Sequence, residues 1–380
     1  MLIIKRYVKR FLMFLYYLMH KKQKKAVFES FSGKSYSDNP RAISEKLHEL
    51  LPEVEIVWLF NDPQKKEKIV PSYVRCVKRN TKNMIKEYST AKIWVNNFCM
   101  HDFIYKGHQN YYIQTWHGDR PFKKVIFESE KLNFKKSEVR EYKTCDLCVS
   151  GSSIGEHVYR KAFLYEGDIL KVGSPRADVL IDNSKDKIEK IKHNLNIPEN
   201  SKVVMYAPTF RDTNGLNTSQ NLDVLDFKKL IQCLKDKYEN EWYCLVRVHP
   251  SISIKNNVVK EDKILNVSDY EDMSDLLLIS DLLITDYSSS AGDFVLKNKP
   301  LILYQYDLEE YEAEDRELHF RMSDSPFWRV SNERELFDFI FNLKEEDVIK
   351  NCRDILSFYG AYESGKASES VCKCIEDKIK

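Results

Sequence analysis

Glycine is scarce in this chain, with 11 among 380 residues. None of them falls in the G-x-G-x-x-G spacing of a dinucleotide-binding turn or in the G-x-x-x-x-G-K spacing of a P-loop. Both patterns need glycine because the backbone must come close to a phosphate. No Asp-x-Asp pair follows a likely strand as a magnesium holder. Dehydrogenases and P-loop kinases are therefore disfavoured, and we expect no cofactor and no metal.

The nine cysteines form no zinc-binding set. The close pairs are Cys145 with Cys148 and Cys372 with Cys374, and no second Cys-x-x-Cys or His-x-x-x-His pattern completes four ligands. We expect reduced and mostly buried thiols in a cytosolic environment.

Long hydrophobic runs are missing as well. The uncharged stretch at residues 11–19 has nine residues, whereas a membrane span needs about 20. Lysines at positions 21, 22, 24 and 25 stand where a signal peptide would have its small-residue cleavage site. The sequence therefore predicts neither a membrane span nor a signal peptide.

An excess of charge is absent overall but present locally. The chain has 60 Lys and Arg against 58 Asp and Glu, a net charge of +2, yet residues 1–25 hold eight basic residues and no acid. The remainder is mildly acidic, which argues against nucleic-acid binding.

Residues 3–19 have the pattern of an amphipathic helix. Apolar and aromatic side chains share one half of the helical wheel, and Lys5, Arg6, Lys9 and Arg10 share the other. We predict that residues 1–25 lie on an anionic membrane surface, which makes the protein peripheral at the cytoplasmic face of the cell membrane. The alternative is a helix that packs on the body or on a partner subunit.

Short apolar stretches alternate with helical patterns through the rest of the chain, in two series separated by the polar segment 181–200. Such alternation is typical of βαβ units and a parallel sheet. We predict an α/β protein with two Rossmann-like domains, 26–185 and 186–380, facing across a cleft. The expected strands are 26–31, 55–60, 92–96, 111–116, 146–150, 202–206, 242–248, 264–267, 281–285 and 300–304.

A histidine follows one strand of the first series. Residues 115–118 read Thr-Trp-His-Gly, and a histidine pKa of about 6.5 suits general-base work on a substrate hydroxyl. His117 is the predicted base, between Trp116 and Gly118. Lys123 and Lys124 are expected to guide an anionic acceptor. A structural histidine and a solvated lysine pair are the alternatives.

Cationic residues follow two strands of the second series. Arg247 and His249 alternate onto one side of their strand and suit an anionic ligand. Arg211 can fork two phosphate oxygens, and Thr209 can donate to one. A solvent-facing edge pair and a loop arginine are the alternatives.

Residues 285–290 read Thr-Asp-Tyr-Ser-Ser-Ser and lead from a strand into a helix. Free backbone N–H groups and hydroxyls suit a phosphate at such a position. A plain helix cap is the alternative, but a cap needs only one such residue. We predict that Thr285, Asp286, Ser288 and Ser289 bind the substrate phosphates.

In this order the motifs resemble the CDP-glycerol glycerophosphotransferase family of teichoic-acid and capsule enzymes, over nearly all of residues 26–315. The segments that carry the resemblance are 28–40 with Ser-Asp-Asn-Pro at its end, Gln-Thr-Trp-His-Gly at 114–118, Gly-Ser-Pro-Arg at 173–176, Tyr-Ala-Pro-Thr-Phe-Arg at 206–211, Arg-Val-His-Pro at 247–250, 279–289, and Tyr-Asp-Leu-Glu-Glu-Tyr at 306–311.

The resemblance implies a GT-B fold and transfer of glycerol phosphate from CDP-glycerol, or a similar CDP-polyol, with release of CMP. The acceptor would be a hydroxyl of a lipid-linked cell-wall or capsular glycan. His117 corresponds to the family's base, His249 to its contact with the donor diphosphate, and 285–289 to its donor-holding segment. The chain is similar to the shorter, primase-like or capsule-type members.

Two segments depart from the family pattern. The family has Thr-Pro-Leu-Lys after the catalytic His-Gly, whereas residues 119–124 read Asp-Arg-Pro-Phe-Lys-Lys, in which the first lysine comes one residue later. Residues 316–328 also differ from the family's usual sequence. Three alternatives therefore stay open: a transferase using CDP-ribitol or a nucleotide sugar, a sugar-nucleotide epimerase on the same scaffold, and a non-catalytic membrane-surface assembly subunit.

Overall fold

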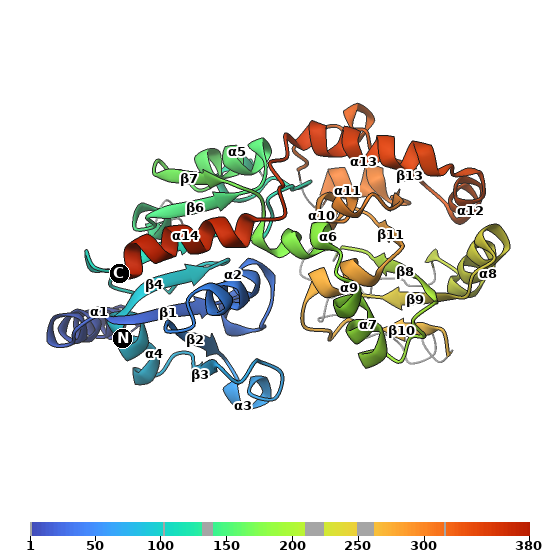
Figure 1. Cartoon of the computed structure of the whole chain (residues 1–380). Coiled ribbons are helices and arrows are strands. Elements are labelled where there is room, and N and C mark those ends of the chain that lie inside the picture. The colour runs from blue at the N-terminus through green and yellow to red at the C-terminus, as the bar shows by residue number, and fades with distance from the viewer. Residues whose placement is uncertain (1, 102, 131–139, 210–223, 249–261, 315–316) are drawn as a thin grey trace. The chain divides into compact units, whose positions relative to one another are not determined.

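The computed structural model describes residues 2–101, 103–130, 140–209, 224–248, 262–314 and 317–380. The chain divides into two compact units (Figure 1). The first unit contains residues 1–119, 126–178 and 362–380, and the second contains 120–125 and 179–361.

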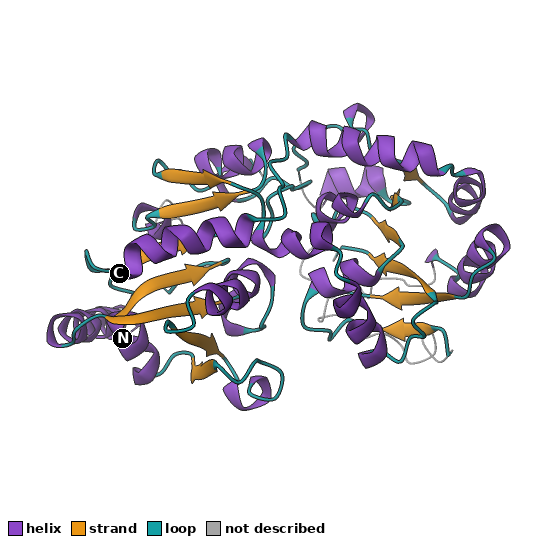
Figure 2. Ribbon diagram, in the orientation of Figure 1, coloured by secondary structure: helices purple, strands orange, loops and turns teal. Residues whose placement is uncertain are grey.

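The first unit is built on a seven-stranded sheet in the order β3-β2-β1-β4-β5-β6-β7, and all of its pairings are parallel (Figure 2). Its strands are β1 (Gln23–Glu29), β2 (Glu55–Phe60), β3 (Val74–Lys78), β4 (Ala91–Asn96), β5 (Tyr111–Gln114), β6 (Leu147–Ser150) and β7 (Asp168–Lys171). Its helices are α1 (Leu2–Met19), α2 (Asp38–Leu50), α3 (Pro63–Lys66), α4 (Lys82–Thr90), α5 (Ser153–Lys161) and α14 (Ala367–Ile379), with short 3₁₀ turns at Phe31–Gly33, Ile126–Glu128, Arg140–Lys143 and Pro175–Ala177.

Both faces of this sheet are apolar because its central strands are covered on both sides. Alternate residues of each strand enter different clusters, as the two-residue period of a strand requires. Phe28, Ile56, Trp58, Ile93 and Val95 pack with residues of α2 and α14. Val27, Val57, Leu59, Trp94 and Tyr112 pack with residues of α1 and α4.

The second unit contains a six-stranded parallel sheet in the order β10-β9-β8-β11-β12-β13. Its strands are β8 (Lys202–Ala207), β9 (Trp242–Val246), β10 (Ile264–Asn266), β11 (Leu282–Thr285), β12 (Leu301–Tyr304) and β13 (Arg329–Val330). Its helices are α7 (Lys185–Asn194), α8 (Phe227–Tyr238), α9 (Met273–Ile279), α10 (Ser290–Phe294), α11 (Leu308–Glu314), α12 (Glu333–Asn342) and α13 (Glu345–Tyr359), with 3₁₀ turns at Val295–Lys297 and Met322–Asp324, and α6 (Asp178–Asp182) leads into it.

The two units differ from the expected domain limits, and residues 120–125 of the expected first domain belong to the second unit. The polar segment 181–200, which separates the two series in the sequence, contains the last two residues of α6 and all of α7, in which Ile191 is buried. The last helix, α14, belongs to the first unit rather than to the second, because Val371, Cys372 and Ile375 complete the apolar cluster on one face of the first sheet.

The N-terminal helix α1 has two different faces. Met13 is fully buried and Tyr17 is 8% exposed, and the Tyr17 hydroxyl lies 3.0 Å from His108 Nδ1. Phe11 and Leu18 are 58% and 61% exposed. Packing on the body therefore accounts for one side of the helix, while membrane binding by the other side stays a prediction. In the described part of the chain, no helix has the length and apolarity needed to cross a membrane.

Candidate active site

His117 follows β5, at the carboxyl edge of the first sheet, and its ring is half-buried. The ring lies among the aromatic rings of Phe31, Phe98 and Trp116, with centroid distances of 5.2, 5.5 and 4.0 Å. Its Nδ1 atom lies 2.8 Å from the backbone oxygen of Asn97. A carbonyl oxygen can only accept, so Nδ1 carries the proton and Nε2 carries a free lone pair.

The electrostatic surroundings favour the neutral form of this ring. Burial lowers the pKa of His117 below its ordinary value. The hydrogen bond to Asn97 and the charge of Asp38 oppose that shift, and the charge of Arg176 adds to it. An imidazole that is neutral and has a free Nε2 lone pair can remove a proton from a hydroxyl at neutral pH.

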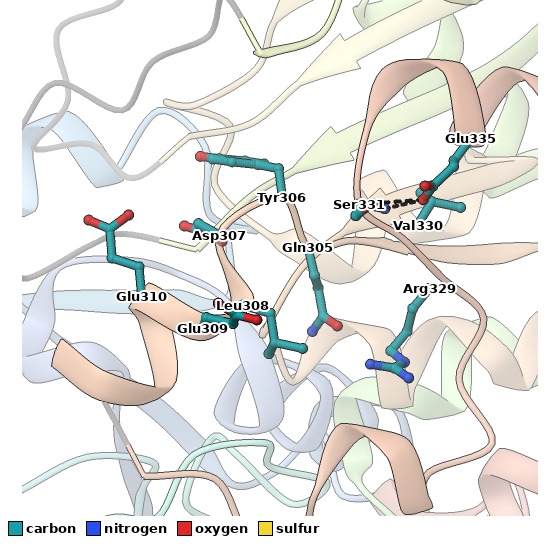
Figure 3. A pocket seen from close by; sticks show the side chains of 10 residues that line it. All are labelled: Gln305, Tyr306, Asp307, Leu308, Glu309, Glu310, Arg329, Val330, Ser331 and Glu335. Atoms are coloured by element: carbon teal, nitrogen blue, oxygen red, sulfur yellow. Dashed lines mark hydrogen bonds between the residues drawn. The ribbon is translucent and has the colours of Figure 1, made fainter.

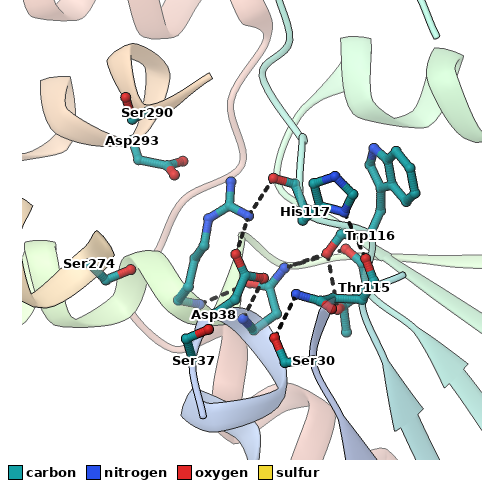
Figure 4. A network of polar contacts seen from close by, with 12 residues as sticks. Ser30, Ser37, Asp38, Thr115, Trp116, His117, Ser274, Ser290 and Asp293 are labelled. Atoms are coloured by element: carbon teal, nitrogen blue, oxygen red, sulfur yellow. Dashed lines mark hydrogen bonds and ion pairs between the residues drawn. The ribbon is translucent and has the colours of Figure 1, made fainter. Parts of the chain in front are cut away.

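Side chains from outside the loop hold the backbone carbonyls of residues 115–117 (Figure 4). Asn39 Nδ2 donates to Trp116 O at 3.1 Å and makes a longer contact of 3.4 Å with Thr115 O. Arg176 Nη1 donates to His117 O at 2.8 Å and to Asp38 Oδ2 at 3.0 Å. Asn39 Oδ1 in turn accepts from the backbone N–H of Arg176 at 3.0 Å.

The loop needs such support because its backbone is strained. Trp116 has a φ of 48°, in the left-handed region that costs a residue with a side chain about 1–2 kcal/mol. Hydrogen bonds to a charged donor contribute roughly 1.5–3 kcal/mol each. The contact from Arg176 alone therefore offsets the strain.

The residue after Gly118 anchors the loop within the first unit. Asp119 Oδ1 accepts from Ser150 Oγ and from the backbone N–H of Gly151, both at 2.8 Å. A Cβ atom at Gly155, in the first turn of α5, would lie 2.2 Å from the same carboxylate oxygen. Only glycine lets the helix come this close to Asp119.

The next residue, Arg120, is buried in the second unit. It is 0% exposed and forms an ion pair with Asp293 of α10. A Cβ atom at Gly292 would lie 2.6 Å from Arg120 Cβ, so this glycine makes room for the arginine. Phe122 then packs on Phe327, with ring centroids 4.9 Å apart. The segment that departs from the family pattern therefore contributes to the core.

Lys123 and Lys124 also belong to the second unit. Lys123 Nζ lies 5.3 Å from the ring centroid of Tyr311. Lys124 donates its backbone N–H to Glu317 O at 2.8 Å, and its ammonium lies 3.7 Å from the Glu317 carboxylate. Both lysines therefore have structural contacts, and their expected action on an acceptor stays a prediction.

The segment after β11, residues 286–290, is called the serine loop below. The Thr285 hydroxyl before it is buried and donates to Ala207 O at 2.6 Å, which joins the ends of β11 and β8. Asp286 Oδ1 accepts from the backbone N–H of Thr209 at 2.8 Å. Ser288 Oγ lies 2.8 Å from Ser290 Oγ. Ser288 and Ser289 are half-buried and keep part of their surface open.

The structure thus brings four of the predicted phosphate-binding residues to one edge of the second sheet: Thr209, Thr285, Asp286 and Ser288. Arg247 follows β9 and donates from Nη1 to Tyr270 O at 3.0 Å. Arg211 and His249 lie outside the described residues.

A cavity of about 610 Å³ lies in the second unit, after β12 and β13 (Figure 3). Asp307, Glu309, Glu310 and Glu335 are among its lining residues, against the single cation of Arg329. Carboxylates repel a diphosphate, so the acidic lining of this cavity disfavours the donor phosphates. Within the described ranges, no group of three His, Cys, Asp or Glu side chains could hold a metal ion.

Sequence reasoning missed the functional part of Asp38, Asn39 and Arg176. They stood only as letters in the Ser-Asp-Asn-Pro and Gly-Ser-Pro-Arg motifs. The signal that could have found them is the presence of an acid, an amide and a cation in two family motifs that contain no predicted catalytic or phosphate-binding residue.

Comparisons with known proteins place this geometry in context. The sequence profile of the family described as "CDP-Glycerol:Poly(glycerophosphate) glycerophosphotransferase" matches residues 11–377. The chain is 33% identical to a teichoic acid poly(glycerol phosphate) polymerase of Staphylococcus epidermidis, covering 94% of this chain but only 51% of that protein. It is 32% identical to a teichoic acid glycerol-phosphate transferase of Staphylococcus aureus, covering 92% of both.

The fold is also similar to that of a solved structure. The wall teichoic acid polymerase TagF superposes with a TM-score of 0.85 and 29% identity, over 100% of this chain and 95% of the solved chain. The expected GT-B-like architecture is thereby confirmed.

Proposed function

Because the chain belongs to the CDP-glycerol:poly(glycerophosphate) glycerophosphotransferase family, we propose that it transfers glycerol phosphate from CDP-glycerol to a hydroxyl of a membrane-linked wall glycan and releases CMP. The family assignment agrees with the resemblance carried by the motifs. The observation that carries the proposal is the fixed tautomer of His117, whose Nδ1–H donates to Asn97 O and whose Nε2 is left as a base.

In the proposed reaction, an acceptor hydroxyl gives its proton to His117 Nε2 as its oxygen attacks the β-phosphorus of CDP-glycerol. The new P–O bond forms opposite the bond between the β-phosphorus and the bridging oxygen. That bond breaks, and the bridging oxygen leaves as part of CMP. The protonated imidazole then returns its proton to solvent. Ser288, Ser289 and Arg247 are proposed to offset charge on the donor phosphates, together with Arg211 and His249.

Release of nucleotide from different donors tests this function. We expect CMP release from CDP-glycerol in the presence of a lipid-linked glycerol-phosphate acceptor. CDP-ribitol and UDP-sugars, offered separately, should give little CMP or UDP. Faster turnover with CDP-ribitol would assign the donor to the ribitol class, UDP release would assign a nucleotide-sugar enzyme, and no turnover with any donor would favour an assembly subunit.

The acceptor is proposed to be reached at the cytoplasmic face of the membrane. Support comes from the exposed side of α1, where Tyr7, Phe11, Leu18 and Met19 are 64%, 58%, 61% and 76% exposed. The exposed Lys21 and Lys24 supply attraction to anionic headgroups, at about 1 kcal/mol each near the surface, whereas Lys25 is buried and paired with Glu87.

Substitutions on that exposed side test membrane binding without opening the core, because Met13 on the other side is buried. The double change Phe11→Ser and Leu18→Ser should weaken binding to anionic vesicles at least tenfold, since each side chain contributes roughly 1.5–3 kcal/mol when buried. Phe341→Ser is the matched control, because Phe341 is 63% exposed on α12. Vesicle sedimentation that stays unchanged in the double variant would reject this part of the proposal.

A further inference from the structure

We propose that Asn39, Arg176 and Asp38 are positioning residues for His117, which hold residues 115–117 in the one backbone conformation that presents the imidazole to an acceptor hydroxyl. This inference rests on the proposed role of His117 as the base. It adds three residues to the reaction that do not themselves touch the reacting atoms.

The geometry is that of a clamp on consecutive carbonyl groups. The Asn39 side chain donates to the carbonyl groups of Thr115 and Trp116, and the Arg176 side chain donates to that of His117. The two clamping residues are themselves joined, because the Arg176 N–H donates to Asn39 Oδ1. They come from the first turn of α2 and from the 3₁₀ turn Pro175–Ala177, so residues 115–119, called the base loop below, are held between two elements distant in sequence.

Backbone strain at both ends of the clamp supports a functional reason for it. Trp116 and Asp38 have φ values of 48° and 65°, in the left-handed region. Residues other than glycine persist there when the surrounding contacts determine their conformation, and such residues cluster at active sites. Asn39 is 2% exposed and Arg176 is 7% exposed, so solvent is largely kept from both clamping side chains.

The pair of charges adds a second effect that a purely structural contact would not have. Asp38 and Arg176 lie 3.0 Å apart and act on the imidazole with opposite sign. Asp38 and Arg176 are the charged groups described around this ring in the first unit. The neutral groups around it are Asn97 and the rings of Phe31, Phe98 and Trp116. Removing Asp38 should make His117 harder to protonate, and removing Arg176 should make it easier.

The kinetic test uses Asn39→Ala, Arg176→Gln, Arg176→Lys and Asp38→Asn in the full chain. For Asn39→Ala and Arg176→Gln we expect kcat to fall, up to roughly 100-fold, while KM for CDP-glycerol stays within twofold. The acid limb of the kcat/KM profile should move to higher pH in Arg176→Gln and to lower pH in Asp38→Asn. Arg176→Lys should keep the acid limb at its wild-type pH but should not reach the wild-type kcat.

A second measurement does not depend on turnover. Histidine-selective NMR titration of the full chain, with His117 assigned by its absence from His117→Gln, should show the same opposite pKa changes in Asp38→Asn and Arg176→Gln. Lys106→Gln is the matched control, because Lys106 forms a half-buried ion pair with Asp146 in the same unit, at 2.8 Å. It should leave the titration and the acid limb unchanged, and thermal melting of every variant checks that it is folded.

The outcomes separate this inference from the proposed function. If the titrations shift as expected but His117→Gln keeps full activity, the clamp is real and the base assignment fails. If His117 proves essential but the Asp38 and Arg176 variants shift together or not at all, the positioning inference is overturned. An effect confined to KM for the donor would overturn it as well.

Discussion

The base loop of the first unit and the serine loop of the second follow a strand at the same kind of sheet edge, yet they are organised differently. The base loop, residues 115–119, is held by side chains distant in sequence, such as Asn39 and Arg176. In the serine loop the hydroxyls bond to each other, as between Ser288 and Ser290. Its contacts with other segments are made by Asp286, which accepts from the Thr209 N–H, and by Tyr287, which stacks on Tyr311.

This difference teaches how each loop should respond to change. A loop held from outside loses its geometry when a distant partner is removed, whereas hydroxyls that bond to one another are sensitive mainly to changes in their own loop. The first arrangement suits a base that must be placed to a fraction of an ångström. The second suits a set of hydroxyls around a flexible, charged diphosphate.

The largest expected effect comes from replacing the proposed base, His117, in the base loop. His117→Ala should lower kcat by about 10²–10⁴-fold, the usual size of a general-base contribution, with little change in KM for CDP-glycerol. Because burial lowers the pKa of His117, the wild-type kcat/KM should fall on the acid side below about pH 6.5, the ordinary histidine pKa. Steady-state assays across pH check both, and activity within a few-fold of wild type would remove His117 from the mechanism.

The next effect concerns Arg120, which follows the base loop and contacts the helix that follows the serine loop. Arg120→Met removes the cationic partner of the buried Asp293 carboxylate, and loss of one partner of a buried ion pair should cost about 3–5 kcal/mol of unfolding free energy. Denaturant unfolding followed by tryptophan fluorescence measures it.

Two further variants sharpen that measurement. Adding Asp293→Leu should recover part of the loss, because a buried pair replaced by apolar side chains leaves no uncompensated charge. Lys124→Met is the matched control, since the partly exposed pair of Lys124 with Glu317 should contribute no more than about 1 kcal/mol. Equal losses for Arg120→Met and Lys124→Met would show that the buried pair is not special.

The smallest effect tests the local character of the serine loop. The double change Ser288→Ala and Ser289→Ala should raise KM for CDP-glycerol about tenfold, because each neutral hydrogen bond contributes roughly 0.5–1.5 kcal/mol. Ser280→Ala is the control: Ser280 is buried just before β11 and donates to Leu276 O. A donor KM that is unchanged in the double variant would remove these hydroxyls from the donor site.

The central strands of both sheets were predictable from sequence, and so was the edge strand β10, but the other edge strands were not. The apolar runs of β2 and β8 predict buried strands because nearly every residue in them is covered. The edge strands β3 and β7 were missed, since their mixed burial leaves exposed residues such as Arg75 and Asp168 and no clear period.

The chemistry was predictable one residue at a time, but not as an arrangement. A histidine at a strand end suggested a base, yet the contact of Arg176 with His117 O joins residues 59 positions apart. No local pattern encodes that contact. The same holds for α14, whose amphipathic sequence shows that one face is buried but not which sheet receives it.

The return of α14 has a practical consequence for taking the molecule apart. The chain passes between the two units four times, after residues 119, 125, 178 and 361. A single cut in the polypeptide therefore releases neither unit whole. A fragment that stops before residue 362 would lack α14 and expose one apolar face of the first sheet to water. Dissecting this protein calls for circular permutation or co-expressed halves, since neither unit is a single contiguous stretch of chain.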